Sequence, residues 1–145
     1  MSRTITSADG TFILSSADIA LAATEIGGWA ADAAWAFDNV NMAETILGVD
    51  GKLSAGWVPR AYQMTVTIMP DSDAIEVFNA FQLACDASKT VYRLNGVLTL
   101  PGLGRSFMMT RGVLQNYTPV PTGQKVLQAQ TFQIMWEGVK PVPIA

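Results

Sequence analysis

The sequence predicts a mainly β protein with one flanking α-helix, built as an antiparallel β-sandwich or barrel in a single domain over residues 1–145. Three observations lead to this prediction. Apolar and polar residues alternate strictly over 62–69, which is typical of a half-buried strand. Apolar residues recur every three or four positions over 73–86, which indicates an amphipathic helix. Most other segments are short β-prone runs separated by glycine, proline, asparagine or aspartate.

The first part of the chain predicts short strands followed by a long excursion. The predicted strands are 12–14, 19–21 and 33–37, the last because tryptophan and phenylalanine alternate there with alanine. Residues 39–59 then leave the sheet, and Asp50-Gly51 near the middle of this segment favours a turn between two strands. We therefore expect a protruding hairpin over about 39–59.

The helix has a predicted start and a predicted buried stripe. Pro70 ends the alternating strand, and the three-residue spacing of Asp73 and Glu76 predicts a capping box with acids at the positive end of the helix dipole. Asn79 and Gln82 are expected to face outward. The apolar stripe expected on the core consists of Ala74, Val77, Phe78, Phe81, Ala84 and Cys85.

Turn signals divide the rest of the chain. Asn95-Gly96 lies between two β-prone runs, 91–94 and 97–100, and predicts a hairpin. A second turn over 101–104 leads into a strand over 105–117, with a bulge at Arg111-Gly112. The final predicted strand covers about 129–136. Pro141 and Pro143 predict an extended tail outside the central strands.

The composition points to contacts with other protein and excludes several functional classes. Hydrophobic residues make up 50% and charged residues 14%, whereas soluble domains carry about 25% charged residues. Much apolar surface should therefore lie against other chains, first of all copies of this one. A net charge of −3 argues against tight duplex binding. The sequence contains no secretory signal and no apolar run of about 18 residues, so we expect no membrane partner.

The residues that usually carry chemistry are missing or have simpler explanations. The chain has no histidine, which removes the commonest general base and metal ligand. Cys85 is the single cysteine, so no intramolecular disulfide can form, and a small apolar role on the helix suffices for it. The segment 48–52 lacks the spacing of a phosphate loop and predicts a hairpin turn. Asp71, Asp73 and Glu76 are explained by the helix start. We expect no catalytic residue, cofactor or metal.

The excursion is the candidate binding surface of the protein. A segment of this length should not leave large apolar side chains in water, because the strands and the helix already supply the core of the subunit. We expect these side chains to contact neighbouring subunits, with the tryptophan as the hot spot. The predicted inter-subunit residues are Met42, Ile46, Leu47, Leu53 and Trp57.

The order of these elements resembles a known family. A glycine-containing turn over 27–32 leads into a strand, the excursion follows with the tip Gly-Val-Asp-Gly-Lys at 48–52, and the alternating strand 62–69 is followed by a Pro-Asp-Ser-Asp helix start at 70–73. The chain ends with a hairpin and the strand 131–136. This order resembles the tail tube proteins of long-tailed bacteriophages, which are similar in fold to the tube protein of the type VI secretion apparatus. The resemblance covers nearly the whole chain.

The resemblance implies a structural protein of a virion tail, assembled in the host bacterial cytoplasm. In that family six subunits close into a ring, inner strands join one continuous barrel, and rings stack into a hollow conduit for the genome. The implied partners are further copies of the chain, the tail sheath, baseplate and tape-measure proteins, and phage DNA that passes without sequence-specific binding. An acidic chain suits that passage, because a lumen that repels phosphate lets DNA slide.

Three other readings remain open at this point. The chain could be another tail component of related fold, such as a baseplate or terminator protein, which would stop at one ring where a tube protein keeps polymerising. It could be a β-barrel that binds a small ligand in a closed pocket of its own core. An enzyme is the third reading, and the missing histidine and the lack of paired buried acids argue against it.

Overall fold

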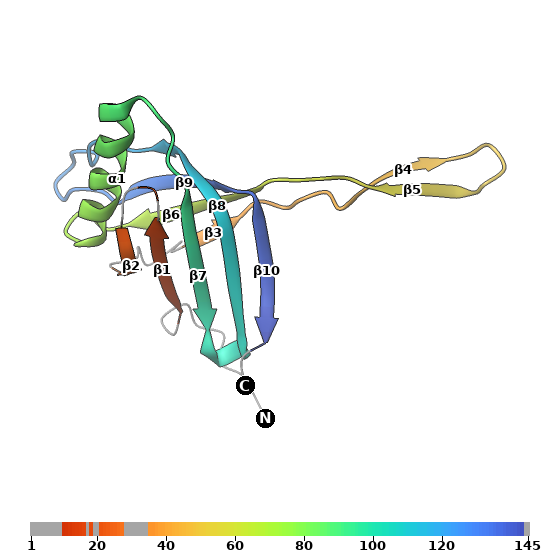
Figure 1. The fold of residues 1–145 in the computed structure, drawn as a ribbon, viewed down its shortest axis with the longest axis horizontal. Helices are drawn as coiled ribbons and strands as arrows, with labels where there is room; N and C mark the ends of the chain where they lie inside the picture. The colour runs from red at the N-terminus through yellow and green to blue at the C-terminus, as the bar shows by residue number, and fades with distance from the viewer. Residues whose placement is uncertain (1–9, 17, 19–20, 28–34, 144–145) are drawn as a thin grey trace.

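The computed structural model describes residues 10–16, 18, 21–27 and 35–143. The elements are mostly antiparallel strands around one helix (Figure 1). In chain order they are β1 (Thr11–Ser16), β2 (Leu21–Ile26), β3 (Trp35–Phe37), β4 (Ala43–Leu47), β5 (Leu53–Trp57), β6 (Tyr62–Ile68), α1 (Ala74–Ser88), β7 (Leu94–Leu100), the 3-10 turn η2 (Pro101–Leu103), β8 (Arg105–Tyr117), β9 (Gln130–Trp136) and β10 (Gly138–Pro143).

The strands form one long sheet and one separate ribbon. The sheet has the order β2-β1-β7-β8-β9-β6-β3, with β10 paired to β8, and the ribbon consists of β4 and β5. The first half of β8 lies between β7 and β10, whereas its second half pairs with β9. The described strands do not close into a barrel, since the path ends at β2 and β3. The predicted mainly β class with one helix is confirmed in its sandwich-like form.

The core is made from alternating strand residues, as the sequence predicts. In β6, Met64, Val66 and Ile68 are fully buried, and every second residue of β9 is buried in the same way. The helix closes this core: Phe78 stacks on Phe132 of β9 with ring centroids 4.3 Å apart and an interplanar angle of 13°. Such aromatic pairs add about 0.5–1.5 kcal/mol beyond the area that they bury.

The helix is confirmed, and its start differs from the predicted capping box. Asp73 occupies the N-cap position but makes no side-chain capping bond. Instead the Oγ of Ser72 accepts a hydrogen bond of 3.1 Å from the N–H of Ala74 and donates one of 2.8 Å to the carbonyl of Gly27. The first turn is therefore tied to the end of β2, an interaction with a residue far away in the sequence. Ile75, absent from the predicted stripe, is also buried.

The predicted hairpin at Asn95-Gly96 is wrong, because both residues lie inside the continuous strand β7. Here glycine permits close packing instead of a turn. A Cβ on Gly96 would lie 3.1 Å from the ring of Trp136 and 3.1 Å from that of Phe12. Asn95 accepts a hydrogen bond of 3.2 Å from the backbone N–H of Arg111 on the neighbouring strand.

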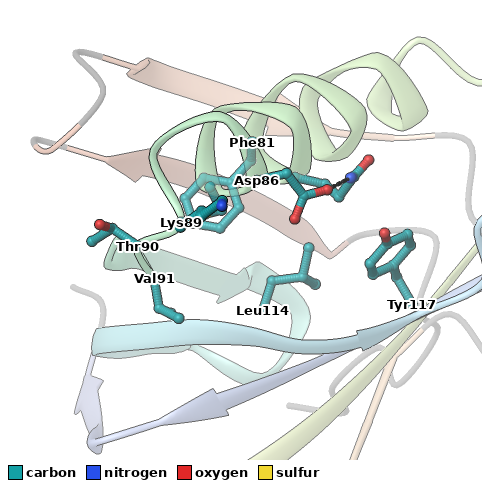
Figure 2. A pocket seen from close by; sticks show the side chains of 9 residues that line it. Phe81, Asp86, Lys89, Thr90, Val91, Leu114 and Tyr117 are labelled. Carbon is teal, nitrogen blue, oxygen red and sulfur yellow. Dashed lines mark hydrogen bonds between the residues drawn. The ribbon is translucent and has the colours of Figure 1, made fainter.

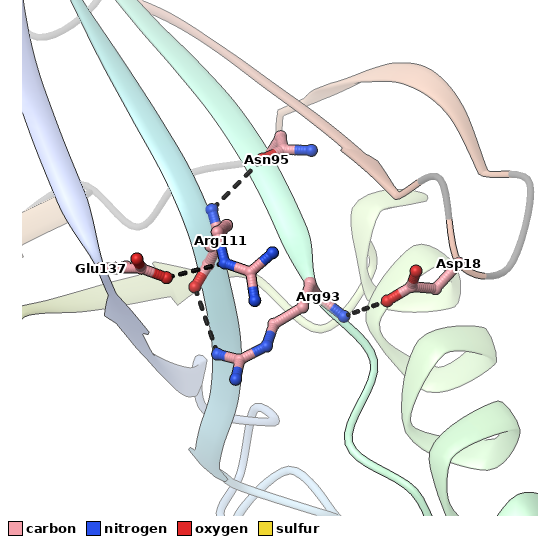
Figure 3. A network of polar contacts seen from close by, with 5 residues as sticks. All are labelled: Asp18, Arg93, Asn95, Arg111 and Glu137. Carbon is pink, nitrogen blue, oxygen red and sulfur yellow. Dashed lines mark hydrogen bonds and ion pairs between the residues drawn. The ribbon is translucent and has the colours of Figure 1, made fainter.

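The predicted bulge at Arg111-Gly112 is confirmed, and polar contacts surround it (Figure 3). Arg111 has a φ of 51°, a left-handed conformation that is uncommon for residues other than glycine. Its Nε lies 2.7 Å from Glu137 Oε2, while the side chain of Arg93 reaches its carbonyl oxygen at 3.5 Å. The bulge lies where β8 stops pairing with β7 and starts pairing with β9. The bend that a bulge introduces helps β8 to pair with both strands.

We expect Gly112→Ala to destabilise the subunit by about 1–3 kcal/mol, the usual cost of overpacking a core. A Cβ at this position would lie 2.4 Å from the buried ring of Trp136, which cannot move into solvent. Urea unfolding measures the loss. Gly27→Ala is the matched control, because it lies outside the hairpin and nothing lies within 4 Å of a Cβ there. Equal stability of the two variants would contradict this account.

Within the part of the chain that the structure describes, the segment with Pro141 and Pro143 forms an edge strand instead of a tail. It pairs with β8 over six residues, from Gly138 opposite Thr110 to Pro143 opposite Arg105. Proline has no N–H, so the ladder to β8 runs through the alternate residues and the proline nitrogens lie on the outer edge. The prediction that this segment stays out of the central strands therefore holds.

The three strands predicted before the excursion are confirmed to different extents. Residues 12–14 lie within β1, and Trp35–Phe37 form β3. Of the predicted strand 19–21 only Leu21 is described, at the start of β2. The expected strand residues 19–20 and 33–34 and most of the predicted turn over 27–32 lie outside the described residues. Among the described helices, none has the length and apolar character needed to cross a membrane.

Candidate assembly surface

The predicted protruding hairpin is present and extends away from the body of the molecule (Figure 1). Its strands β4 and β5 pair from Ala43 opposite Trp57 to Leu47 opposite Leu53. Both strands pair with nothing else among the described residues. The arms that carry the ribbon continue from β3 and β6, and a bond of 3.1 Å from the N–H of Asp38 to the carbonyl of Gln63 begins this extension.

The tip is a tight turn with the geometry that its sequence predicts. The N–H of Gly51 donates to the carbonyl of Gly48 at 3.0 Å, and Gly51 has a φ of 83°. A left-handed residue after the turn is the usual way to close a hairpin of this kind, and glycine adopts it without strain. The Oδ1 of Asp50 also accepts the N–H of Lys52 at 3.1 Å. The segment 48–52 is therefore a structural turn, as predicted.

Every residue of β4 and β5 is exposed, which distinguishes this ribbon from the other strands. Leu47 is 70% exposed and Trp57 is 69% exposed. A lone two-stranded ribbon is marginally stable in water, and large apolar side chains at this exposure mark an interaction site. All five predicted inter-subunit residues are exposed on this excursion: Met42, Ile46, Leu47, Leu53 and Trp57.

The register divides the ribbon into two unequal faces. Residues that lie opposite each other in an antiparallel pair share a face. Leu47, Leu53 and Trp57 therefore lie on one face, which we call the apolar face; its other members are Ala43, Thr45 and Ala55. The opposite face carries Glu44, Ile46, Ser54 and Gly56. The sequence predicted the residues but not this division, which depends on the register.

Arg60 stiffens the base of the hairpin. Its guanidinium carbon lies 6.0 Å from the ring centroid of Trp57 and 5.5 Å from that of Tyr62, so it interacts with both aromatic faces. Such cation–π contacts contribute about 0.5–1 kcal/mol each at exposed sites. The contact with Trp57 restricts this side chain while most of its surface stays in water, which lowers the entropy lost when a partner covers it.

A groove also lies between the C-terminal end of α1 and β8 (Figure 2). It has a volume of about 240 Å³, and Leu114 and Tyr117 of β8 face the helix across it. Phe81 lies on the helix side, and a hydrogen bond joins the side chains of Gln82 and Asp86. Cys85, half-buried against the core, also lines the groove and fits the predicted role of a small apolar residue.

Other residues considered as sites form no cluster in the described structure. Within the described ranges, no group of three or more His, Cys, Asp or Glu side chains could hold a metal ion. Asp71, Asp73 and Glu76 lie at the start of the helix, as expected. One exposed apolar group was not predicted from the sequence. It lies in the connection between β8 and β9 and consists of Val120, Val126 and Leu127. Valine and leucine in a loop outside any predicted strand or helix are the sequence signal for this group.

Comparison with known proteins supplies both a family and a fold. The model of the family described as tail fiber protein gp32 matches residues 3–140. A comparison with curated proteins gives no significant match.

Among solved structures, a chain of the anti-feeding prophage baseplate, determined by cryo-EM with six-fold symmetry, is similar with a TM-score of 0.64 at 11% identity, covering 99% of both chains. A chain of the cap that terminates the anti-feeding prophage tube is similar with a TM-score of 0.57 at 15% identity, covering 99% of this chain and 93% of that one.

A third similar chain comes from the sheath–tube complex of an extracellular contractile injection system in its extended state. Its TM-score is 0.51 at 13% identity, covering 92% of this chain and 88% of that one. At these low identities, the TM-scores above 0.5 and the high coverage show a shared fold. The chain, with its protruding ribbon and open sheet, therefore shares its fold with these chains. Because the family model covers most of the sequence, the chain belongs to the tail fiber protein gp32 family and is a tail-associated structural protein of phage-like particles.

Proposed function

We propose that the protein is a ring-forming subunit of a tail tube, with six copies in each ring and rings stacked into a hollow conduit for the genome. The observation that carries this proposal is the hairpin of β4 and β5, which extends from the body with all of its strand residues exposed. Burying such a ribbon requires another chain. Met42, Ile46, Leu47, Leu53 and Trp57 are the proposed inter-subunit residues, with Trp57 as the hot spot.

The open sheet supports closure into a ring. Its path ends at β2 and β3, and the described residues offer neither strand a second neighbour. Joining the two ends of this path between copies would produce a continuous barrel. The net charge of −3 favours a lumen that repels DNA. Sheath, baseplate and tape-measure proteins are the further partners that this role implies.

A terminal ring of the tube is the second candidate. The likeness to the baseplate chain, with a TM-score of 0.64 over 99% of both chains, exceeds that to the chain of the sheath–tube complex, at 0.51. A subunit of a terminal ring would associate through its sides and stop, whereas a tube subunit would continue to stack. The two candidates therefore differ in the size distribution of the assembled protein.

Negative-stain microscopy of the purified protein tests both candidates. We expect rings with a central channel, and hollow filaments that lengthen as the protein concentration rises, because stacking is an association that follows mass action. Rings that never stack would favour the terminal role. A strictly monomeric species at high concentration, measured by light scattering, would contradict both.

A further inference from the structure

The molecule has a second exposed apolar surface at the end opposite the hairpin. The connection between β8 and β9 carries Val120 and Val126, each 70% exposed, and Leu127, 51% exposed. Val126 and Leu127 also line a cavity of about 320 Å³ with Met69, Pro70 and Asp71 from the turn between β6 and α1. We call these six residues the loop-end surface.

The loop-end surface has a defined shape. The N–H of Gln128 donates to the carbonyl of Thr122 at 3.1 Å, and the side chain of Gln128 donates to the carbonyl of Val126 at 2.9 Å. The buried side chain of Gln130 donates to the carbonyl of Thr118 at 2.9 Å, which fastens the base of the loop. A loop closed by its own hydrogen bonds presents its apolar side chains at a small entropic cost on binding.

The relative position of the hairpin and the loop-end surface favours the hairpin of another copy as the partner of the loop-end surface. In Figure 1 the tip of the hairpin and the β8–β9 connection lie at opposite ends of the longest axis of the molecule. Two different apolar ends on one chain suit a head-to-tail contact, which repeats in one direction without closing. If the hairpins of two copies packed on each other, the loop-end surfaces would stay exposed and the assembly would stop at a dimer.

Each of the two ends carries one acidic and one basic side chain. The tip carries Asp50 and Lys52, while the loop end carries Lys125 and Asp71. All four residues are exposed, and no ion pair engages them among the described residues. A head-to-tail contact would allow Asp50 to pair with Lys125 and Lys52 to pair with Asp71, and such pairs at a rim contribute little affinity.

We infer that the hairpin tip of one copy docks on the loop-end surface of the next copy. The apolar side chains beside the tip, with the fully exposed Val49 foremost, would cover Val126 and Leu127 and enter the cavity beside Met69. This inference rests on the proposed self-assembly and names the surface that receives the hairpin. In this contact two different surfaces of identical chains meet, so the stacking is heterologous and the two ends of the assembled tube differ.

A disulfide between two differently marked copies tests the contact. Cys85, the single natural cysteine, is first replaced by alanine in both copies. One copy then carries Val49→Cys and the other Val126→Cys, and the two are mixed before assembly and oxidised. A disulfide forms when the Cα atoms approach to about 5.5 Å, so we expect a mixed dimer on a non-reducing gel. Leu83→Cys, a similarly exposed position on the helix, replaces Val126→Cys in the control and should give no mixed dimer.

The possible results separate this inference from the proposed function. A mixed disulfide in assembled particles supports the contact. Particles by microscopy without the mixed disulfide overturn the contact and leave the tube proposal standing. Val49→Cys copies linked to one another mean hairpin-to-hairpin packing and also overturn it. Absence of both particles and disulfide overturns the contact together with the proposed function.

Discussion

Replacing Leu47 and Trp57 together by serine is expected to leave a folded subunit that no longer forms rings or tubes. Both side chains lie on the apolar face of the hairpin and contribute little to the core of their own subunit, since each is about 70% exposed. Burying a large apolar side chain contributes about 1.5–3 kcal/mol. Loss of two such side chains from every contact should weaken a repeated association by several powers of ten.

Circular dichroism and negative-stain microscopy of the same sample measure this result. The matched control replaces Leu83 and Val91 by serine, two exposed apolar residues outside the hairpin. That variant should fold and assemble, so a general loss of apolar surface can be separated from loss of the hairpin contact. Normal polymerisation of the Leu47→Ser/Trp57→Ser variant, or its unfolding, would show that the hairpin is not the assembly element.

Phe81→Ala is expected to destabilise the subunit by about 3–5 kcal/mol, the range for truncating a buried phenylalanine. Phe81 is 2% exposed and belongs to the core between the helix and the sheet. It also lines the groove beside Leu114, so truncation would enlarge an existing hollow. The domain is small, and a loss of this size would remove a large part of its stability.

Urea unfolding should be measured on the Leu47→Ser/Trp57→Ser background, because assembly would otherwise add its own free energy to the apparent stability. Leu83→Ala is the control on the same helix, where the side chain is mostly exposed. Its loss should stay within about 0.5 kcal/mol, as is usual for surface substitutions. A loss of less than about 1 kcal/mol for Phe81→Ala would place the wrong face of the helix on the core.

Local patterns predicted the elements that local physics determines. The alternation in β6 and β9, the helix from 74 onward and the turn at Gly51 each depend on neighbours within a few residues, and the structure confirms them. The hairpin predicted at Asn95-Gly96 failed for the opposite reason. Gly96 is required by the rings of Phe12 and Trp136, which are distant in the sequence, and that demand overrides the turn preference of the dipeptide.

The helix start and the candidate site also show that local features can be predicted from the sequence, whereas features that depend on distant residues cannot. Ser72 forms the capping bond in place of Asp73, because its hydroxyl also reaches the carbonyl of Gly27 at the end of β2. The exposed apolar residues of the hairpin could be predicted, since a long excursion has no core to enter. Their division between two faces, and the receiving surface at Val126 and Leu127, depend on register and on the folding of the β8–β9 connection.

The prolines of β10 affect the tendency of the subunit to aggregate through its exposed strand edges. Exposed strand edges recruit one another through backbone hydrogen bonds, which is the route to amyloid-like fibrils. Pro141 and Pro143 remove two donors from the outer edge of β10, so this edge is a poor template for further strands. The contact proposed for the hairpin, in contrast, is made by side chains and needs no open strand edge. Because the outer edge of β10 resists strand addition, ordered contacts through side chains are favoured over irreversible edge-to-edge aggregation.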